Sequence, residues 1–301
     1  MTAWQKPFAG IQLNRTHPLS KGIVGCWLFN EGSGGKVFDY SGEGNEGVIN
    51  GAVWTHGKTG SSLNFSTDYI DLANVSLGLT TNATFSAIVK ADALDGAFHT
   101  IVGKRSTAGN YPYVFAVNTN SVVIFASDLT PANGGDIALP STSWHHVVGT
   151  IDTNREYATY IDGVPGANTA ITGGTISESS EPFFLGLNYA GAAFGPWAGK
   201  IDNVMIWNRA LAASEVQNLY LEPYSMFSIA TPAKYFFMPV AVTPSVEGRV
   251  MGGGGGGISR KRKRKRTPKT MLQDKRFKFS IEEDDEELMQ IIKMITGGDI
   301  K

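Results

Sequence analysis

A short loop rich in acids, amides and glycines follows the first predicted strand and offers several metal-binding oxygens. Residues 39–46 read DYSGEGNE and include Asp39, Ser41, Glu43, Asn45 and Glu46. Calcium takes about six to eight oxygen ligands, and glycine-rich turns let backbone carbonyls converge on one point. The loop therefore fits a calcium site. It fits equally well a tight turn in which Asp39 hydrogen-bonds to nearby amides.

The sequence gives little support for a catalytic site. A glycosidase needs closely spaced carboxylates that face one sugar, and residues 18–224 contain no E-x-D-x-E pattern. His145 and His146 are adjacent on a predicted strand, so they point to opposite faces and cannot act on one substrate. There is no nucleophile elbow, phosphate loop or cysteine cluster. We therefore expect a binding or structural protein and not an enzyme.

Glycan binding requires exposed aromatic rings beside polar loop groups. The best loop aromatics are Tyr111, in AGNYPY, and Tyr189 and Phe194, in NYAGAAFGPW. We take these three residues as the candidate glycan-binding positions.

The elements that position these residues are predicted to be strands. Between residues 18 and 224, short runs rich in Val, Ile, Phe, Tyr and Trp alternate with turns, and the 36 glycines have no fixed period. Asp162-Gly163 suits a two-residue hairpin turn. The run WHHVVGTID, at 144–152, carries apolar side chains on both faces, as packing of two sheets requires. One short helix is expected within residues 210–224. The sequence thus predicts an all-β fold.

The sequence shows no pattern for disulfide bonds, membrane insertion or export. Cys26 lies in a predicted strand, which favours a buried thiol and excludes an internal disulfide framework. No stretch approaches the roughly 20 apolar residues needed to cross a bilayer, and the first residues lack an export signal. We therefore expect a soluble protein without a signal peptide or transmembrane segment.

The C-terminal part differs in composition. Residues 225–257 predict a proline-rich arm that exposes Phe236 and Phe237, followed by a hinge of six glycines. Residues 258–279 predict a basic linker, whose run of seven cations suits nonspecific contact with a polyanion. A nuclear-import signal and a tether to an acidic surface have the same composition. The run consists of Arg260, Lys261, Arg262, Lys263, Arg264, Lys265 and Arg266.

Residues 280–301 predict an amphipathic helix. Ser280 and Glu283 form a capping box, and acids crowd the first turns. A helix this short is only marginally stable in isolation. Its apolar stripe is therefore expected to dock on a partner or to self-associate. The stripe comprises Leu288, Ile291, Ile292 and Ile295.

Eight segments in order carry a family resemblance. They run from GIVGCWLFNEGSGGKVFDYSGEGNEGVINGAVW through GKTGSSLNFSTDYIDL, TFSAIVKA, TIVGK, WHHVVGTID, YIDGV and PFFLGLN to AGKIDNVMIWNRALAASEVQNLY. The series resembles the laminin-G-like, concanavalin A-like domain family over roughly two-thirds of the chain. The resemblance implies a jelly-roll sandwich of two antiparallel sheets. It also implies a Ca²⁺ site at the sandwich rim, made by Asp39, Asn45 and Asp202. This sequence departs from the family pattern at Glu43, Glu46 and Asn203.

The flanks LNRTHPLSKGIVG and EPYSMF resemble those of such domains in tailed-bacteriophage genomes. We accordingly expect an N-terminal arm (1–17), a sandwich (18–224), and the arm, linker and helix described above. The chain is interpreted as a virion-associated structural or decoration protein, made in the host cytoplasm. Its tail would bind other virion proteins, its domain would bind cell-surface glycans, and it could form a homo-oligomer. A free lectin module is the alternative, and a nuclear protein a more distant one.

Overall fold

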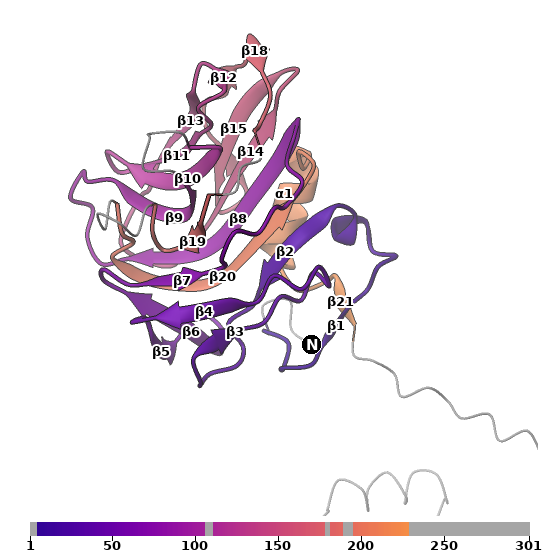
Figure 1. The fold of residues 1–301 in the computed structure, drawn as a ribbon, viewed down its shortest axis with the longest axis vertical. Helices are drawn as coiled ribbons and strands as arrows, with labels where there is room; N and C mark the ends of the chain where they lie inside the picture. The colour runs from indigo at the N-terminus through magenta and orange to yellow at the C-terminus, as the bar shows by residue number, and fades with distance from the viewer. Residues whose placement is uncertain (1–4, 106–110, 178–180, 189–194, 229–301) are drawn as a thin grey trace, which may run out of the picture. The chain divides into compact units, whose positions relative to one another are not determined.

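Two large antiparallel sheets pack face to face in the computed structural model (Figure 1). The structure describes residues 5–105, 111–177, 181–188 and 195–228. Apart from residues 225–228, the C-terminal arm, basic linker and helix predicted above therefore lie outside the described residues. The predicted all-β sandwich is confirmed.

The first sheet has eight strands, in the order β13-β11-β10-β9-β19-β7-β4-β3. Their bounds are β13 (Asn133–Ala138), β11 (Ser121–Phe125), β10 (Tyr113–Asn118), β9 (His99–Lys104), β19 (Phe183–Leu185), β7 (Tyr69–Asp71), β4 (Gly47–Asn50) and β3 (Lys36–Val37). Because β19 lies between β9 and β7, a late segment of the chain is held between two early ones.

The second sheet has nine strands, and its main path runs β16-β15-β14-β8-β20-β6-β5. Two further strands pair with it, β17 with β15 and β2 with β20. The bounds are β16 (Val164–Pro165), β15 (Glu156–Ile161), β14 (His145–Asp152), β8 (Asn82–Ala91), β20 (Gly199–Trp207), β6 (Ser61–Phe65), β5 (Val53–His56), β17 (Thr169–Ala170) and β2 (Ile23–Trp27).

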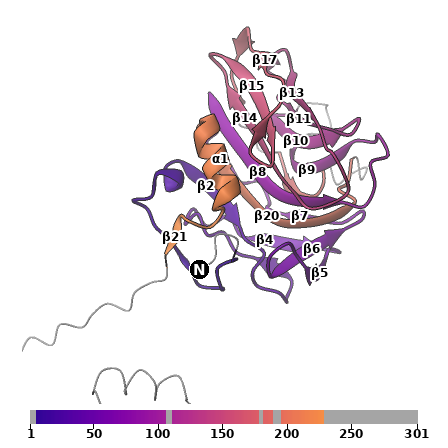
Figure 2. The same ribbon diagram turned by 180° about the vertical axis from the view of Figure 1, so that it is seen from behind.

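Alternation along the strands divides the apolar residues into layers. On β14, Val147 and Ile151 face the main core between the sheets, whereas Val148 faces a second cluster on the outer side. Helix α1 (Ala213–Leu221) lies against the nine-stranded sheet (Figure 2), and its Val216 and Leu219 belong to that second cluster. The two-faced pattern predicted for WHHVVGTID is thus confirmed, and so is the short helix.

The predicted Asp162-Gly163 hairpin is also present. Asp162 has φ 52° and Gly163 has φ 79°, and β15 pairs with β16 across this turn. These positive φ values explain the residue pair, since glycine adopts them without strain and aspartate tolerates them.

Both ends of the described chain pack on the sandwich. Strand β1 (Gln12–Leu13) pairs with β21 (Phe227–Ser228), and Met226 is fully buried. A 3-10 turn, η1 (Pro18–Ser20), leads into β2. A small pair, β12 (Leu129–Thr130) with β18 (Gly173–Gly174), completes the described elements. The packed unit therefore extends beyond the predicted 18–224 boundaries in both directions.

Within the described ranges, no helix has both the length and the apolar character required to span a membrane.

Candidate functional site

A shallow cavity of about 180 Å³ lies on the outer face of the eight-stranded sheet. We call it the aromatic pocket, and its lining residues are Phe98, Arg105, Tyr111, Val114, Phe125 and Asn188. Val114 and Phe125 are cross-strand partners on β10 and β11, and their neighbours Phe115 and Ile124 fill the main core. Strand alternation therefore directs Val114 and Phe125 to the outer face.

The rings of the aromatic pocket contact one another. Phe98 and Phe125 have centroids 5.4 Å apart, and Tyr111 meets Phe125 edge-on at 6.3 Å with an interplanar angle of 86°. The Arg105 guanidinium carbon lies 5.9 Å from the centre of the Tyr111 ring, within the range of a cation–π interaction. All four side chains are half-buried. The pocket thus combines a partly accessible aromatic wall with one cationic donor group.

A buried polar atom completes this site. Asn188 is only 3% exposed, and its Oδ1 has no hydrogen-bond partner among the described residues. Asn188 packs directly against β9 at Gly103. A Cβ at position 103 would collide with the backbone of Leu187 and Asn188, so that position requires glycine. A buried acceptor without a donor costs about 1–3 kcal/mol. A ligand that donates a hydrogen bond to Oδ1 would remove this cost.

One predicted glycan-binding residue lies in this pocket. Tyr111 is on its wall, whereas Tyr189 and Phe194 lie outside the described residues. The basic run 260–266 and the proposed docking residues at 236–237 and 288–295 are outside them as well. Their roles remain predictions.

The acidic loop after β2 forms a hydrogen-bonded turn. Asp39 Oδ1 accepts from the backbone N–H groups of Cys26 (2.9 Å) and Ser41 (2.8 Å). Its Oδ2 accepts from Ser41 Oγ (2.7 Å) and from the N–H of Asn45 (3.0 Å). These four bonds fill the roughly four lone-pair positions of a carboxylate. All four donors belong to the protein, as the turn interpretation expects, and the role of Asp39 as a calcium ligand stays a prediction.

Asn45 fastens the same turn to the first strand. Its side-chain amide donates to the carbonyl of Val24 (3.0 Å), and its own carbonyl accepts from Trp27 Nε1 (2.7 Å). The local hydrogen-bonding alternative predicted for this loop accounts for all of these contacts.

Asp202, the third predicted calcium ligand, is engaged elsewhere. It lies on β20, is fully buried, and forms an ion pair with Lys6. Its Oδ2 accepts from the N–H of Thr59 (3.0 Å). Among the described residues, no group of three or more His, Cys, Asp or Glu side chains is placed to hold a metal ion. The calcium role of Asp39, Asn45 and Asp202 stays a prediction.

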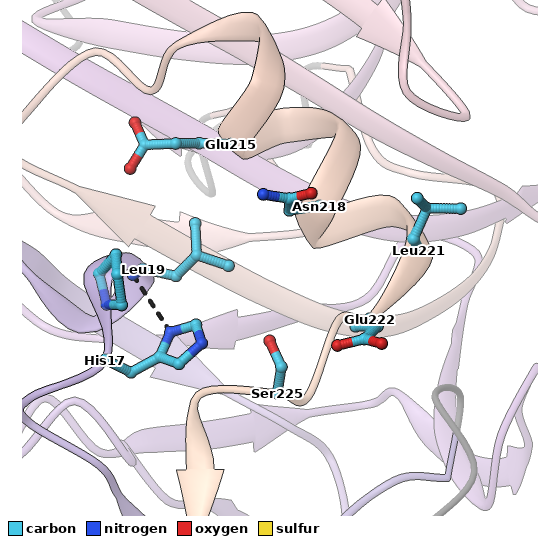
Figure 3. Close-up of a pocket in the computed structure, with 8 residues that line it drawn as sticks. His17, Leu19, Glu215, Asn218, Leu221, Glu222 and Ser225 are labelled. Carbon is cyan, nitrogen blue, oxygen red and sulfur yellow. Dashed lines mark hydrogen bonds between the residues drawn. The ribbon is translucent and has the colours of Figure 1, made fainter.

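A second cavity, of about 370 Å³, lies between η1 and α1 (Figure 3). It brings His17, Glu222 and Ser225 together, a set that could suggest nucleophilic catalysis. His17 Nδ1, however, accepts the N–H of Leu19 (3.2 Å), so in the neutral imidazole the proton resides on Nε2. A protonated Nε2 cannot take a proton from Ser225. The cavity therefore lacks an activated nucleophile in this arrangement.

A third polar group, which residue spacing did not reveal, consists of Ser141, His145 and Asp162. His145 Nε2 lies 3.0 Å from Ser141 Oγ, and its Nδ1 lies 2.7 Å from Asp162 Oδ2. This is the order of a serine–histidine–aspartate triad. The other Asp162 oxygen accepts the N–H of His146 (2.9 Å), so the same network also ties the hairpin turn to β14.

Comparison with known proteins agrees with the fold. Residues 64–217 match the family described as the concanavalin A-like lectin/glucanases superfamily. No curated protein matches the chain. Among solved structures, domain 4 of AbnA, an extracellular GH43 arabinanase from Geobacillus stearothermophilus solved with arabinotriose, is 20% identical with a TM-score of 0.51. That match covers 66% of this chain and 98% of the arabinanase domain.

Two further structures match over smaller shares of their own length. The binding domain of Paraclostridial Mosquitocidal Protein 1 is 16% identical, has a TM-score of 0.56, and is matched over 69% of this chain and 53% of its own. A mutant of Trypanosoma rangeli sialidase with trans-sialidase activity is 20% identical, with a TM-score of 0.52 and coverages of 74% and 37%. Identities this low indicate a shared fold alone. The family match spans half of the chain, and the chain therefore belongs to the concanavalin A-like lectin/glucanase superfamily.

Proposed function

We propose that the sandwich is a carbohydrate-binding domain whose ligand occupies the aromatic pocket. The observation that carries this proposal is the combination of half-buried aromatic rings with a buried, unpaired acceptor at Asn188. Binding pockets are typically apolar and aromatic with a few convergent polar groups.

The chemistry of a sugar matches the pocket in three respects. One face of a pyranose or furanose ring presents C–H groups, which pack against the electron-rich face of Tyr111 or Phe125. A ring hydroxyl donates to Asn188 Oδ1. The guanidinium of Arg105 is a donor only, so it pairs with a sugar oxygen or a carboxylate.

Two observations support binding rather than hydrolysis. The arabinanase domain with a similar fold was solved in complex with arabinotriose. The described lining of the aromatic pocket carries no carboxylate, whereas glycosidases of the usual kind use a pair of them. A role as a lectin-type module therefore fits these residues better than a role as a glucanase.

Replacing Tyr111 with alanine should abolish most of the glycan affinity. We expect the full chain to bind a subset of a glycan array that includes arabinotriose and sialic-acid-terminated glycans. For the glycan with the strongest signal, Tyr111→Ala should raise the Kd at least about tenfold, because about 1.4 kcal/mol of ring contact is lost. Isothermal titration calorimetry measures this change, and the melting temperature reports whether the fold is kept.

The matched control is Phe38→Ala. Phe38 is an aromatic residue that is 47% exposed and does not line the pocket, so its removal should leave the Kd unchanged. Asn188→Leu should weaken binding while removing the unpaired acceptor. If no glycan binds, or if Tyr111→Ala binds as tightly as the unmodified chain, carbohydrate binding at this pocket is refuted.

We also propose that the C-terminal residues attach the domain to a larger assembly, such as a phage particle. The support is in the sequence: an apolar arm, a glycine hinge, a basic run and a capped amphipathic helix, none of which is needed to close the core of the sandwich. Two weak contacts on one flexible tether reinforce each other through effective concentration.

Truncation at Ser228 should separate folding from attachment. The chain should end there, and not at Tyr224, because Met226 is buried and β21 pairs with β1. We expect the truncated chain to keep its melting temperature and its glycan affinity, yet to be lost from purified particles that retain the full chain. Leu288→Asp with Ile292→Asp should also reduce incorporation. Full incorporation of the truncated chain would place the attachment surface on the sandwich.

A further inference from the structure

The Lys6 ammonium is buried in a site made entirely of oxygen atoms. Lys6 Nζ donates to the carbonyl of Ser61 (2.5 Å) and to the carbonyl of Asp202 (2.9 Å), and it also contacts Asp202 Oδ1. The Lys6 side chain is only 4% exposed. An ammonium has three N–H donors, so three oxygen partners satisfy it completely.

The site depends on an irregularity in β20. Ile201 pairs with Val89 and Asn203 pairs with Ile88, so Asp202 is left out of the ladder at a bulge. A bulge leaves one residue unpaired and redirects its groups. The Asp202 carbonyl is thereby available to the ammonium from the same residue that supplies the carboxylate.

A second carboxylate contributes negative charge. Glu31 interacts electrostatically with Lys6, and although its Oε1 accepts the N–H of Phe38 (2.8 Å), its Oε2 is buried without a partner in the described structure. Burial lowers the pKa of Lys6, while Asp202 and Glu31 oppose that shift by stabilising the ammonium. Removal of Lys6 would thus leave two carboxylates and two carbonyls without a cation.

The oxygens around the Lys6 ammonium are of the kind that bind hard cations. Carboxylate and carbonyl oxygens are the ligands that Ca²⁺ takes in proteins, with water completing the coordination. A divalent ion could neutralise the charges of Asp202 and Glu31. We infer that the Ser61 carbonyl and the Asp202 carbonyl and carboxylate form a cation site that the chain fills with the Lys6 ammonium, and that the site accepts Ca²⁺ once that ammonium is removed.

The N-terminal arm holds Lys6 in this site. Asn30 Nδ2 donates to the carbonyl of Pro7 (3.0 Å), so the residue after Lys6 is held against the same rim. The N-terminal arm thereby places the Lys6 ammonium beside Ser61 and Asp202, where it neutralises the buried carboxylate in place of a metal ion. The site shares Asp202 with the one expected at Asp39, Asn45 and Asp202, but its other contact to the ammonium is the carbonyl of Ser61.

The test compares Ca²⁺ responses of the full chain with and without Lys6. The unmodified chain should melt at the same temperature in EDTA and in millimolar CaCl₂. Lys6→Met should melt at a lower temperature in EDTA, and CaCl₂ should raise that temperature by about 5 °C. Calorimetric titration with CaCl₂ should show one site in Lys6→Met and none in the unmodified chain. Adding Asp202→Asn to Lys6→Met should remove the response, because Asp202 is the carboxylate that contacts the ammonium.

Two further variants control for nonspecific Ca²⁺ effects and for a failure of Lys6→Met to fold. Lys36→Met removes an exposed lysine and should show no Ca²⁺ response. If Lys6→Met does not fold in EDTA, Lys6→Gln keeps two amide donors without the charge and should show the same calcium-dependent rise. The inference is overturned if the unmodified chain binds Ca²⁺ through Asp202, or if neither Lys6 variant responds to Ca²⁺.

Discussion

Asp39→Ala should destabilise the protein by about 3–5 kcal/mol, because hydrogen bonds to a charged acceptor are each worth about 1.5–3 kcal/mol and four of them end on this carboxylate. Three of the donors are backbone N–H groups, of Cys26, Ser41 and Asn45. Their loss detaches the acidic loop from β2. Urea unfolding of the full chain in EDTA measures the change.

The same variant distinguishes the two interpretations of this loop. If the carboxylate only closes a turn, the loss is the same in EDTA and in CaCl₂. A calcium ligand would instead give a loss that appears only when calcium is present. Asp39→Asn keeps one acceptor oxygen and should lose about half as much, and Glu43→Gln, which changes an exposed acid in the same loop, should stay within about 0.5 kcal/mol. A calcium-dependent loss would restore the metal interpretation.

The sequence was informative about this turn because its contacts are local. Asp39 reaches donors two, six and thirteen residues away, so residue types and glycines within one loop suffice to predict the turn. The same holds for the Asp162-Gly163 hairpin and for the period-two pattern of β14. In each case the controlling interactions lie within one strand or one turn.

The aromatic pocket and the Lys6 site could not be predicted in this way. Tyr111 could be proposed as a loop aromatic, but Phe98, Phe125 and Asn188 join it only through the register of β9, β10 and β11 and the placement of β19. Lys6 and Asp202 are separated by 196 residues, and their contact depends on a bulge that no local pattern marks. A single lysine near the N-terminus gives no signal of which distant carboxylate it will contact.

His146 should make the folded protein sensitive to mild acid. The residue is 1% exposed, its Nε2 lies 2.9 Å from Ser86 Oγ, and its ring stacks on Tyr220 with an interplanar angle of 14°. Burial lowers the pKa of His146 from 6.5 to about 4, with Lys58 acting in the same direction and Asp162 against it. The folded protein therefore holds this imidazole neutral where an unfolded chain would protonate it.

The direction of the effect follows from this difference. Above pH 6.5 both states are neutral at His146, so the residue causes no pH dependence. As the pH falls from 6.5 to about 4, the unfolded state binds a proton that the folded state does not, and the free energy of unfolding decreases. At about 1.4 kcal/mol for each pKa unit, the loss amounts to about 3 kcal/mol at pH 4. Below that value both states are protonated and this contribution stops changing.

Urea unfolding at pH 7.5, 6, 5 and 4.5 measures this loss, and His146→Gln isolates the histidine from the other acids and bases. Glutamine does not titrate and can still hydrogen-bond to Ser86, so its unfolding free energy should fall less steeply by the predicted amount. His56→Gln removes an exposed histidine and should reproduce the slope of the unmodified chain. If His146→Gln shows the same pH dependence as the unmodified chain, His146 is protonated in the folded state. The interior between β14 and α1 would then admit a charge that its burial and its neighbours are expected to exclude.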